Sequence, residues 1–221
     1  APRIMGHELG GDIVEVGSDV TELKVGDRCA VYFYLTCHRC RWCRGGRETL
    51  CEAFKGFVGV HRDGGYAEYV SLPVENFLHI PTGLSYEAAA MATDAVNTNW
   101  HCMKERAKVN PHDQVLLIGA GGGVGIHGVQ VAKAFGARVI AMDVSDEKLE
   151  LAKQWGADEV IHVKKEKDLV AAVNSVGAKK CGIAFIPPPV APPPCPSSRT
   201  SSTGTSTGTG RVNCRVPIGT V

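Results

Sequence analysis

Residues 115–125 read VLLIGAGGGVG, a short apolar run followed directly by a glycine cluster. The run Val115–Ile118 has the length of a buried strand, and the stretch from about Val124 to Phe135 has the pattern of a helix. A glycine-rich turn between a strand and a helix lets the backbone approach a pyrophosphate closely. The helix N-terminus then offers N–H groups and the positive end of its dipole. The stretch therefore predicts a dinucleotide-binding turn.

The residue expected to complete this turn is Asp143, which ends the next predicted strand 18 residues after Gly125. An acid at about this distance accepts hydrogen bonds from the adenosine ribose, and its charge would repel a 2′-phosphate. NAD is therefore favoured over NADP. The alternative is a tight glycine turn in which Asp143 only caps a helix. The candidate cofactor-binding glycines are Gly119, Gly121, Gly122, Gly123 and Gly125.

Strands and helices alternate on the C-terminal side of this turn. Further strands are expected at Val139–Met142, Val160–Ile161 and Cys181–Ile186, and helices after Ser145 and near Glu166–Val176. This alternation predicts a parallel sheet with helical crossovers over residues 91–186.

The region before the turn, residues 1–90, has a β-rich pattern instead. The stretches Asp12–Val16, Arg28–Phe33 and Tyr66–Val70 are expected to be strands, because they alternate or are apolar and are bounded by turn residues. Ser85 is expected to cap an alanine-rich helix. The sequence thus predicts two domains of different architecture.

Four cysteines stand close together within the β-rich region, as Cys37-x2-Cys40-x2-Cys43-x7-Cys51. Four thiolates on one small loop can surround Zn²⁺ tetrahedrally, and such a closed shell leaves no position for chemistry. The alternative is a set of loose thiols. Because no export signal precedes them, metal is favoured over disulfides. We therefore predict a structural zinc site.

The last residues, 187–221, break the pattern with two proline triplets and a serine, threonine and glycine run. No Asp or Glu follows Asp168, and little in this segment can be buried. We expect it to be a disordered, low-complexity tail, read as a linker, a glycosylated stalk or, with more weight, a frame change in a partial coding region.

The composition excludes several classes of function. The chain of 221 residues is 44% hydrophobic and 21% charged, with a formal net charge of +1. This balance gives no excess charge for nucleic acid or an anionic membrane, and no run approaches the length of a membrane span. The N-terminal residues lack a signal-peptide pattern, so a cytoplasmic location is expected, and the chain is expected to begin within a domain.

Two further stretches carry reactive side chains, His7-Glu8 and Asp94. From the residues alone each can be structural or functional. Combined motifs are more informative. They are Gly6-His7-Glu8 with Gly10 and Val14-x-x-Gly17, the four-cysteine spacing, Gly64-Gly65-Tyr66-Ala67-Glu68 and the glycine turn.

This order of motifs resembles the zinc-containing medium-chain alcohol dehydrogenases over about residues 2–186. The resemblance implies an α/β protein: a GroES-like catalytic domain with a structural-zinc lobe, partial at its N-terminus, over residues 1–90. A partial Rossmann domain, a doubly wound parallel sheet that binds NAD, would follow over residues 91–186.

The resemblance also implies roles at a catalytic zinc. His7 would be a ligand, and Glu8 would lie beside the metal and be able to exchange onto it. Asp94 would be another ligand, and Thr98 would lie near the nicotinamide. The implied reaction is hydride transfer from an alcohol carbon to NAD⁺, in which zinc lowers the pKa of the bound alcohol.

On the nucleotide side, the resemblance implies that Val124 lies behind the nicotinamide ring and that Lys148 helps Asp143 hold the ribose. The implied partners are a small alcohol or carbonyl substrate and further copies of the chain, as a homodimer or homotetramer.

The sequence departs from the family pattern in three ways. The first cysteine ligand of the catalytic zinc is expected before residue 1, so we expect weak catalytic zinc and little turnover from this chain. The Rossmann half stops near its fourth strand. The glycine turn is one residue longer than the commonest form and, read as Gly119-x-x-Gly122-x-x-Gly125, also resembles the zinc-free quinone reductases.

Three functions therefore stay open. The first is a zinc-dependent, NAD-linked alcohol dehydrogenase. The second is a zinc-free quinone or enoyl-type reductase of the same superfamily, against which the cysteine lobe argues. The third is a zinc-stabilised binding module without catalysis.

Overall fold

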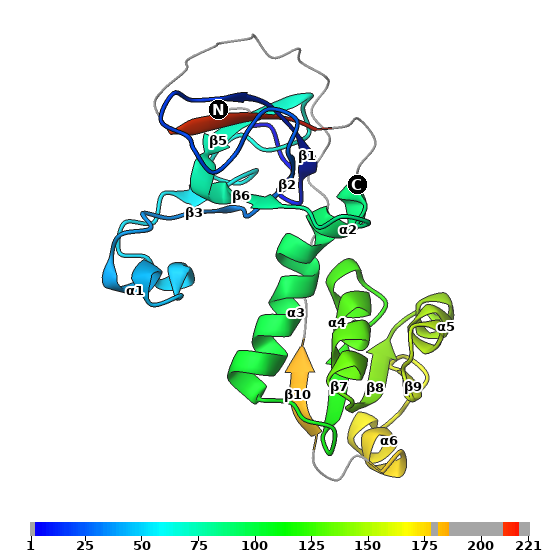
Figure 1. Ribbon diagram of the computed structural model, residues 1–221. Coiled ribbons are helices and arrows are strands. Elements are labelled where there is room, and N and C mark those ends of the chain that lie inside the picture. The colour runs from blue at the N-terminus through cyan, green and yellow to red at the C-terminus, as the bar shows by residue number, and fades with distance from the viewer. Residues whose placement is uncertain (1–2, 178–180, 186–209, 217–221) are drawn as a thin grey trace. The chain divides into compact units, whose positions relative to one another are not determined.

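The computed structural model describes residues 3–177, 181–185 and 210–216, which fall into two compact units (Figure 1). Unit 1 contains the residues up to Asp94 together with residues 210–216, and unit 2 begins at Ala95. The sequence predicts boundaries near residues 90 and 186. The difference is that part of the C-terminal segment belongs to the first unit.

Unit 1 is built on an antiparallel sheet of strand order β5-β11-β1-β2-β6, with a separate two-stranded ladder β3-β4. Its strands are β1 (Gly10–Val16), β2 (Arg28–Val31), β3 (Tyr34–Leu35), β4 (Gly56–Phe57), β5 (Tyr69–Pro73), β6 (Phe77–His79) and β11 (Arg211–Arg215). Its helical turns are α1 (Arg41–Arg44), η1 (Glu48–Leu50), η2 (Val74–Asn76) and α2 (Tyr86–Met91). The predicted β-rich architecture is confirmed.

One predicted strand begins later than expected. Residues 66–68 are not part of β5, because the backbone of residues 64–66 bonds to residues 4–6 instead. Gly64 N–H donates to the Ile4 carbonyl at 2.8 Å, and Tyr66 N–H to the Met5 carbonyl at 2.9 Å. A Cβ at Gly64 would lie 2.0 Å from the Gly6 carbonyl oxygen, so only glycine permits this approach. The contact holds the segment that carries His7 against the loop before β5.

The prediction of a disordered tail over residues 187–221 is wrong for Arg211–Arg215. This segment forms β11, which lies between β1 and β5 in the sheet and is antiparallel to both (Figure 1). Its inward residues Val212 and Cys214 are each 1% exposed. Apolar and polar residues alternate in this short stretch, which is the pattern of a strand with one buried face. The prediction of disorder instead rested on the composition of the whole segment 187–221, in which proline, serine, threonine and glycine dominate.

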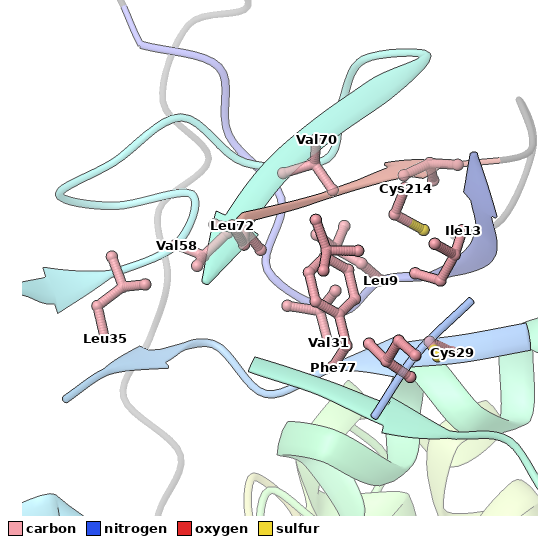
Figure 2. Packing of buried hydrophobic residues seen from close by; sticks show 13 residues of the cluster. Leu9, Ile13, Cys29, Val31, Leu35, Val58, Val70, Leu72, Phe77 and Cys214 are labelled. Carbon is pink, nitrogen blue, oxygen red and sulfur yellow. The ribbon is translucent and has the colours of Figure 1, made fainter. Parts of the chain in front are cut away.

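The core of unit 1 lies against one face of this sheet, as Figure 2 shows. It is formed mainly by aliphatic side chains, with one phenylalanine and two buried thiols. Its labelled members are Leu9, Ile13, Cys29, Val31, Leu35, Val58, Val70, Leu72, Phe77 and Cys214. Because β11 supplies part of this set, the C-terminal segment contributes to the same core as the N-terminal strands.

Unit 2 contains a parallel sheet of order β10-β7-β8-β9, which confirms the predicted α/β architecture. Its strands are β7 (Gln114–Ile118), β8 (Arg138–Asp143), β9 (Glu159–His162) and β10 (Cys181–Phe185). Its helices are α4 (Gly123–Ala134), α5 (Asp146–Gln154) and α6 (Leu169–Ser175). In the described part of the chain, no helix is long and apolar enough to cross a membrane.

Polar caps fix where the helices begin. The Ser85 and Ser145 hydroxyls accept the N–H groups of Ala88 and Lys148, as expected for N-caps. Helix α6 begins at Leu169 rather than near residue 166, because the Asp168 carboxylate accepts the Ala171 N–H at 3.0 Å.

A long helical segment runs from α2 into unit 2. It consists of η3 (Ala92–Val96), α3 (Asn97–His101) and η4 (Cys102–Ala107), of which η3 and η4 are wide π-type turns. It ends at Lys108, which adopts a left-handed conformation with φ 54°. Such wide turns shift side chains out of the α-helical register, and they are frequent at functional sites.

Candidate functional site

The four predicted zinc ligands meet at one point in unit 1. One ligand atom from each of Cys37, Cys40, Cys43 and Cys51 lies within 4.8 Å of the others. The Cys43 sulfur is 3.5 Å from that of Cys40 and 3.9 Å from that of Cys37. Four sulfurs about 2.3 Å from a central zinc are roughly 3.8 Å apart, so the set has the size of a tetrahedral zinc shell.

Backbone N–H groups of the lobe point at these sulfurs. The N–H of Cys37 donates to the Cys51 sulfur at 3.3 Å, and that of Cys40 to the Cys37 sulfur at 3.4 Å. The Arg39 N–H is the largest cause that lowers the pKa of the Cys37 thiol, to about 6. Burial instead raises the pKa of Cys43 to about 12. The loop thus favours the thiolate form of Cys37, while the Cys43 thiol needs a nearby cation to ionise, and a zinc ion would provide one.

The surroundings of the lobe agree with a closed site. His38 has a left-handed backbone, φ 53°, and its Nε2 lies 3.1 Å from the Thr36 hydroxyl. It is not among the clustered ligands. Arg41 packs over the Trp42 ring and pairs with Glu52 at 2.9 Å, on the outside of the lobe. The four sulfurs therefore gather without any other His, Cys, Asp or Glu ligand of the described residues, in a cluster that could hold a zinc ion.

His7 and Asp94, the two predicted ligands of a catalytic zinc, also lie together in unit 1. The His7 Nε2 is 3.0 Å from the Asp94 Oδ2, and both side chains are partly exposed, 38% and 25%. The hydrogen bond that the His7 ring makes to the Asp94 carboxylate raises the pKa of His7, helped by the charge of half-buried Glu8 and opposed by burial. The His7 ring also packs against Phe33, with centroids 5.0 Å apart.

This pair does not complete a metal site by itself. A catalytic zinc takes three protein ligands. Apart from the cysteine lobe, the described residues hold no group of three or more His, Cys, Asp or Glu side chains within ligand distance of one another. The other predicted residue of this site, Thr98, is half-buried on α3 in unit 2. The structure therefore brings together two of the three ligands that the resemblance implies.

The predicted nucleotide turn joins β7 to α4. Gly119 has a positive φ of 73° and makes the turn, Gly122 caps the helix, and Gly123 is its first residue. A Cβ at Gly125 would lie 2.2 Å from the Gly119 carbonyl oxygen, so glycine is needed there for the helix to approach the strand. Gly123 is exposed, and a Cβ there would meet nothing within 4 Å. The turn thus leaves an open helix N-terminus.

Asp143 and Lys148 both contact the middle of this turn at Gly121. The Asp143 carboxylate accepts the Gly121 N–H at 3.0 Å and the Val144 N–H at 2.7 Å, and the residue is 6% exposed. A Cβ at Gly121 would lie 2.2 Å from the Lys148 Cβ. Each carboxylate oxygen keeps a further lone pair for a ribose hydroxyl. The residues therefore fit a dinucleotide, with Asp143 also holding the turn.

One residue of this region was missed by the sequence analysis. Asn99, on α3, is fully buried, and its side-chain amide donates to the Val124 carbonyl within the turn helix. The only signal in the sequence is an asparagine in an otherwise helical stretch, which does not identify its partner.

Comparisons with known proteins agree with both halves of the chain. Residues 1–82 match the family of alcohol dehydrogenase GroES-like domains, and residues 123–186 match the zinc-binding dehydrogenases. An alcohol dehydrogenase of Geobacillus stearothermophilus is 46% identical over 164 residues, which are 74% of this chain and 48% of that protein. An L-threonine 3-dehydrogenase of Legionella pneumophila is 40% identical over 177 residues, 80% of this chain and 50% of that protein.

A solved structure shows the same likeness. The crystal structure of an NAD-dependent alcohol dehydrogenase superposes with a TM-score of 0.76 at 37% identity, covering 83% of this chain and 53% of that one. The chain spans about half the length of the curated relatives it matches. With the cysteine lobe and the nucleotide turn in place, these matches show that the chain belongs to the zinc-containing medium-chain alcohol dehydrogenase family.

Proposed function

We propose that the whole protein to which these two units belong is a zinc-dependent oxidoreductase that transfers a hydride between a small alcohol and NAD. The observation that carries this proposal is the turn in which Asp143 and Lys148 both contact Gly121 beside an open helix N-terminus. The relatives named as alcohol and threonine dehydrogenases support the substrate class.

In this proposal the turn holds NAD through its backbone. The free N–H groups in the first turn of α4, which begins at Gly123, would receive the pyrophosphate. Asp143 and Lys148 would orient the adenosine ribose, and Val124 and Thr98 would flank the nicotinamide, as the resemblance implies. When bound, the nicotinamide accepts the hydride, while the protein supplies orientation and excludes water.

Unit 1 would contribute the metal-binding side. His7 and Asp94 stand within hydrogen-bond distance of each other, and Glu8 is next to His7 in the chain. Because two protein ligands hold zinc more weakly than three, we predict little or no alcohol oxidation by the 221-residue chain itself. Measurable turnover by this chain would contradict that prediction.

The alternative in the same superfamily is a zinc-free quinone or enoyl-type reductase. The spacing of the glycine turn, Gly119-x-x-Gly122-x-x-Gly125, is the observation in its favour. The cysteine lobe favours the zinc-dependent enzyme. Metal analysis of the whole protein separates them: two zinc ions per subunit support the alcohol dehydrogenase, and one supports the reductase.

The cofactor is tested on the chain as it stands. NADH at concentrations well above its dissociation constant should stabilise unit 2 against unfolding, since a ligand that binds only the folded state raises its stability. No stabilisation by NADH would reject the cofactor and leave a zinc-stabilised binding module as the better interpretation.

The proposal also includes a location in the cell and an oligomeric state. Clustered thiols keep their metal in a reducing compartment, which supports a cytoplasmic location. A homodimer or homotetramer stays a prediction from the resemblance, and light scattering of the whole protein tests it.

A further inference from the structure

Asn99 lies at the base of the nucleotide turn and is buried to 0% exposure within unit 2. Its Nδ2 donates to two backbone carbonyls, those of Ala95 and Val124, each at 2.8 Å. The first lies on the same helical segment four residues earlier, and the second lies 25 residues away in the first turn of α4. One amide group therefore ties the two segments together.

The orientation of this amide is fixed by its partners. Both contacts are to carbonyl oxygens, which accept only, so the atom that faces them has to be the NH₂ group. The Oδ1 then points elsewhere, and among the described residues it has no hydrogen-bond partner. A buried acceptor without a partner is costly and rare in folded proteins. Asn99 thus donates two hydrogen bonds through its NH₂ group, and the cost is a buried Oδ1 that accepts none from the described residues.

The backbone of α4 is adapted to this side chain. A Cβ at Gly128 would lie 2.7 Å from the Asn99 Oδ1 and 3.3 Å from Leu117. Glycine in the middle of a helix is unfavourable relative to alanine, so its presence here allows the close approach of the Asn99 amide. The absence of a side chain at Gly128 therefore leaves the space that the Asn99 amide occupies.

We propose that Asn99 is a positioning residue for the cofactor: it fixes the first turn of α4, and with it the N–H groups that receive the pyrophosphate. This inference rests on the proposed function, because it requires the turn to bind a dinucleotide. Asn99 would act through the Val124 carbonyl and would not touch the cofactor. Its chain neighbour Thr98 lies on the same helical turn, so one contact would set the position of both elements.

The test measures NADH affinity of the full chain by the change in nicotinamide fluorescence, at a temperature where each variant is folded by circular dichroism. Asn99→Leu removes both donors and keeps the side-chain size. We expect it to weaken NADH binding about tenfold, as the loss of one well-formed hydrogen bond at the turn implies. The matched control is Gln130→Leu, which removes another amide-to-carbonyl contact of α4, to Ile126 at 3.3 Å, and should change binding less than about twofold.

A second variant keeps the proposal testable if Asn99→Leu does not fold. Gly128→Ala leaves Asn99 and the turn intact but places a methyl group against the amide oxygen, and alanine favours the helix. It too should weaken NADH binding. If wild type binds NADH and a folded Asn99→Leu or Gly128→Ala variant binds it equally well, the positioning role is wrong while the proposed cofactor stands. If wild type itself does not bind NADH, the proposed function fails and this inference with it.

Discussion

His7 and Asp94, 87 residues apart in the chain, share a hydrogen bond of 3.0 Å between Nε2 and Oδ2. The contact joins the segment before β1 to the start of the long helical segment. It places an imidazole nitrogen and a carboxylate oxygen side by side, two kinds of atom that can bind a divalent metal. The hydrogen bond to Asp94 raises the pKa of His7, so the contact favours the protonated imidazole.

A double-mutant cycle measures this pair in metal-free protein. At pH 5, well below the ordinary histidine pKa of about 6.5, combining His7→Ala with Asp94→Ala should reveal a coupling of about 0.5–1 kcal/mol in urea unfolding. The value is modest because both groups are partly exposed. The His162 and Asp146 pair, at 3.8 Å, is the control and should couple by about 0.2 kcal/mol or less. Equal coupling energies in the two cycles would mean that the His7–Asp94 contact stabilises the protein no more than the longer His162–Asp146 contact.

Metal removal tests the cysteine lobe. We expect one tightly bound zinc per chain, and its loss to a chelator should unfold residues 37–51 without affecting unit 2. Cobalt substituted for zinc should give the thiolate-to-cobalt absorption of a four-sulfur site. Cys51→Ser should abolish this spectrum, whereas Cys102→Ser, a cysteine outside the cluster, should leave it unchanged. A metal content that is unaffected by Cys51→Ser would exclude this site.

The features that the sequence predicted are those in which neighbouring residues carry the information. The cysteine lobe and the glycine turn each lie within about fifteen residues, so spacing alone indicates their chemistry. The pairing of His7 with Asp94 is nonlocal and was reached only through the family resemblance. The contact of Asn99 with Val124 depends on how α3 packs on α4, which no pattern in either segment specifies.

The position of β11 could not be predicted for a related reason. Whether Arg211–Arg215 forms a strand depends on partners about 140 to 200 residues away, since an isolated five-residue strand is unstable in water. The composition of the tail indicated disorder. The alternating apolar and polar residues of β11 nevertheless let it pair with β1 and β5 and bury one of its faces.

A substitution in β11 tests whether this strand belongs to the core. Val212→Asp places a charge among Leu72, Val16 and their neighbours, and should destabilise unit 1 by about 3 kcal/mol or more. Amide exchange in β1 and β5 should accelerate, while exchange in β7 and β8 stays unchanged. Arg215→Gln, on the exposed side of the same strand, is the control and should have little effect. Equal exchange in the two variants would contradict the placement of β11.

Acid should weaken unit 2 through Asp158. Burial alone raises the pKa of Asp158, but the Val139 N–H at 2.7 Å and the Lys133 ammonium at 2.9 Å more than offset this, and the pKa is lowered. A lowered pKa means that the contribution to stability is complete above the unfolded value, about 3.9, and is lost as pH falls through the folded value. The loss should therefore occur below about pH 4.

The comparison of Asp158→Asn with wild type measures this contribution. At pH 7 the variant should be less stable by about 1 kcal/mol, a small value because the carboxylate is partly exposed. Its unfolding free energy should fall less steeply than that of wild type below pH 4. Glu147→Gln, which removes an exposed carboxylate on α5, serves as the control. If both variants show the same acid dependence, Asp158 is not the group responsible.

Two glycines of the nucleotide turn should separate stability from binding. Gly121→Ala forces a methyl group into the Lys148 side chain at 2.2 Å, so it should displace α5 or the turn and destabilise unit 2 by about 1–3 kcal/mol. Gly123→Ala meets nothing within 4 Å and lies in the first turn of a helix, so it should leave stability unchanged or slightly raised. Because Gly123 is exposed at the helix N-terminus proposed to receive the pyrophosphate, its added methyl group should nevertheless weaken NADH binding. Thermal unfolding with and without NADH measures both effects on the same samples. A Gly123→Ala variant that binds NADH as tightly as wild type would show that the cofactor does not approach this end of α4.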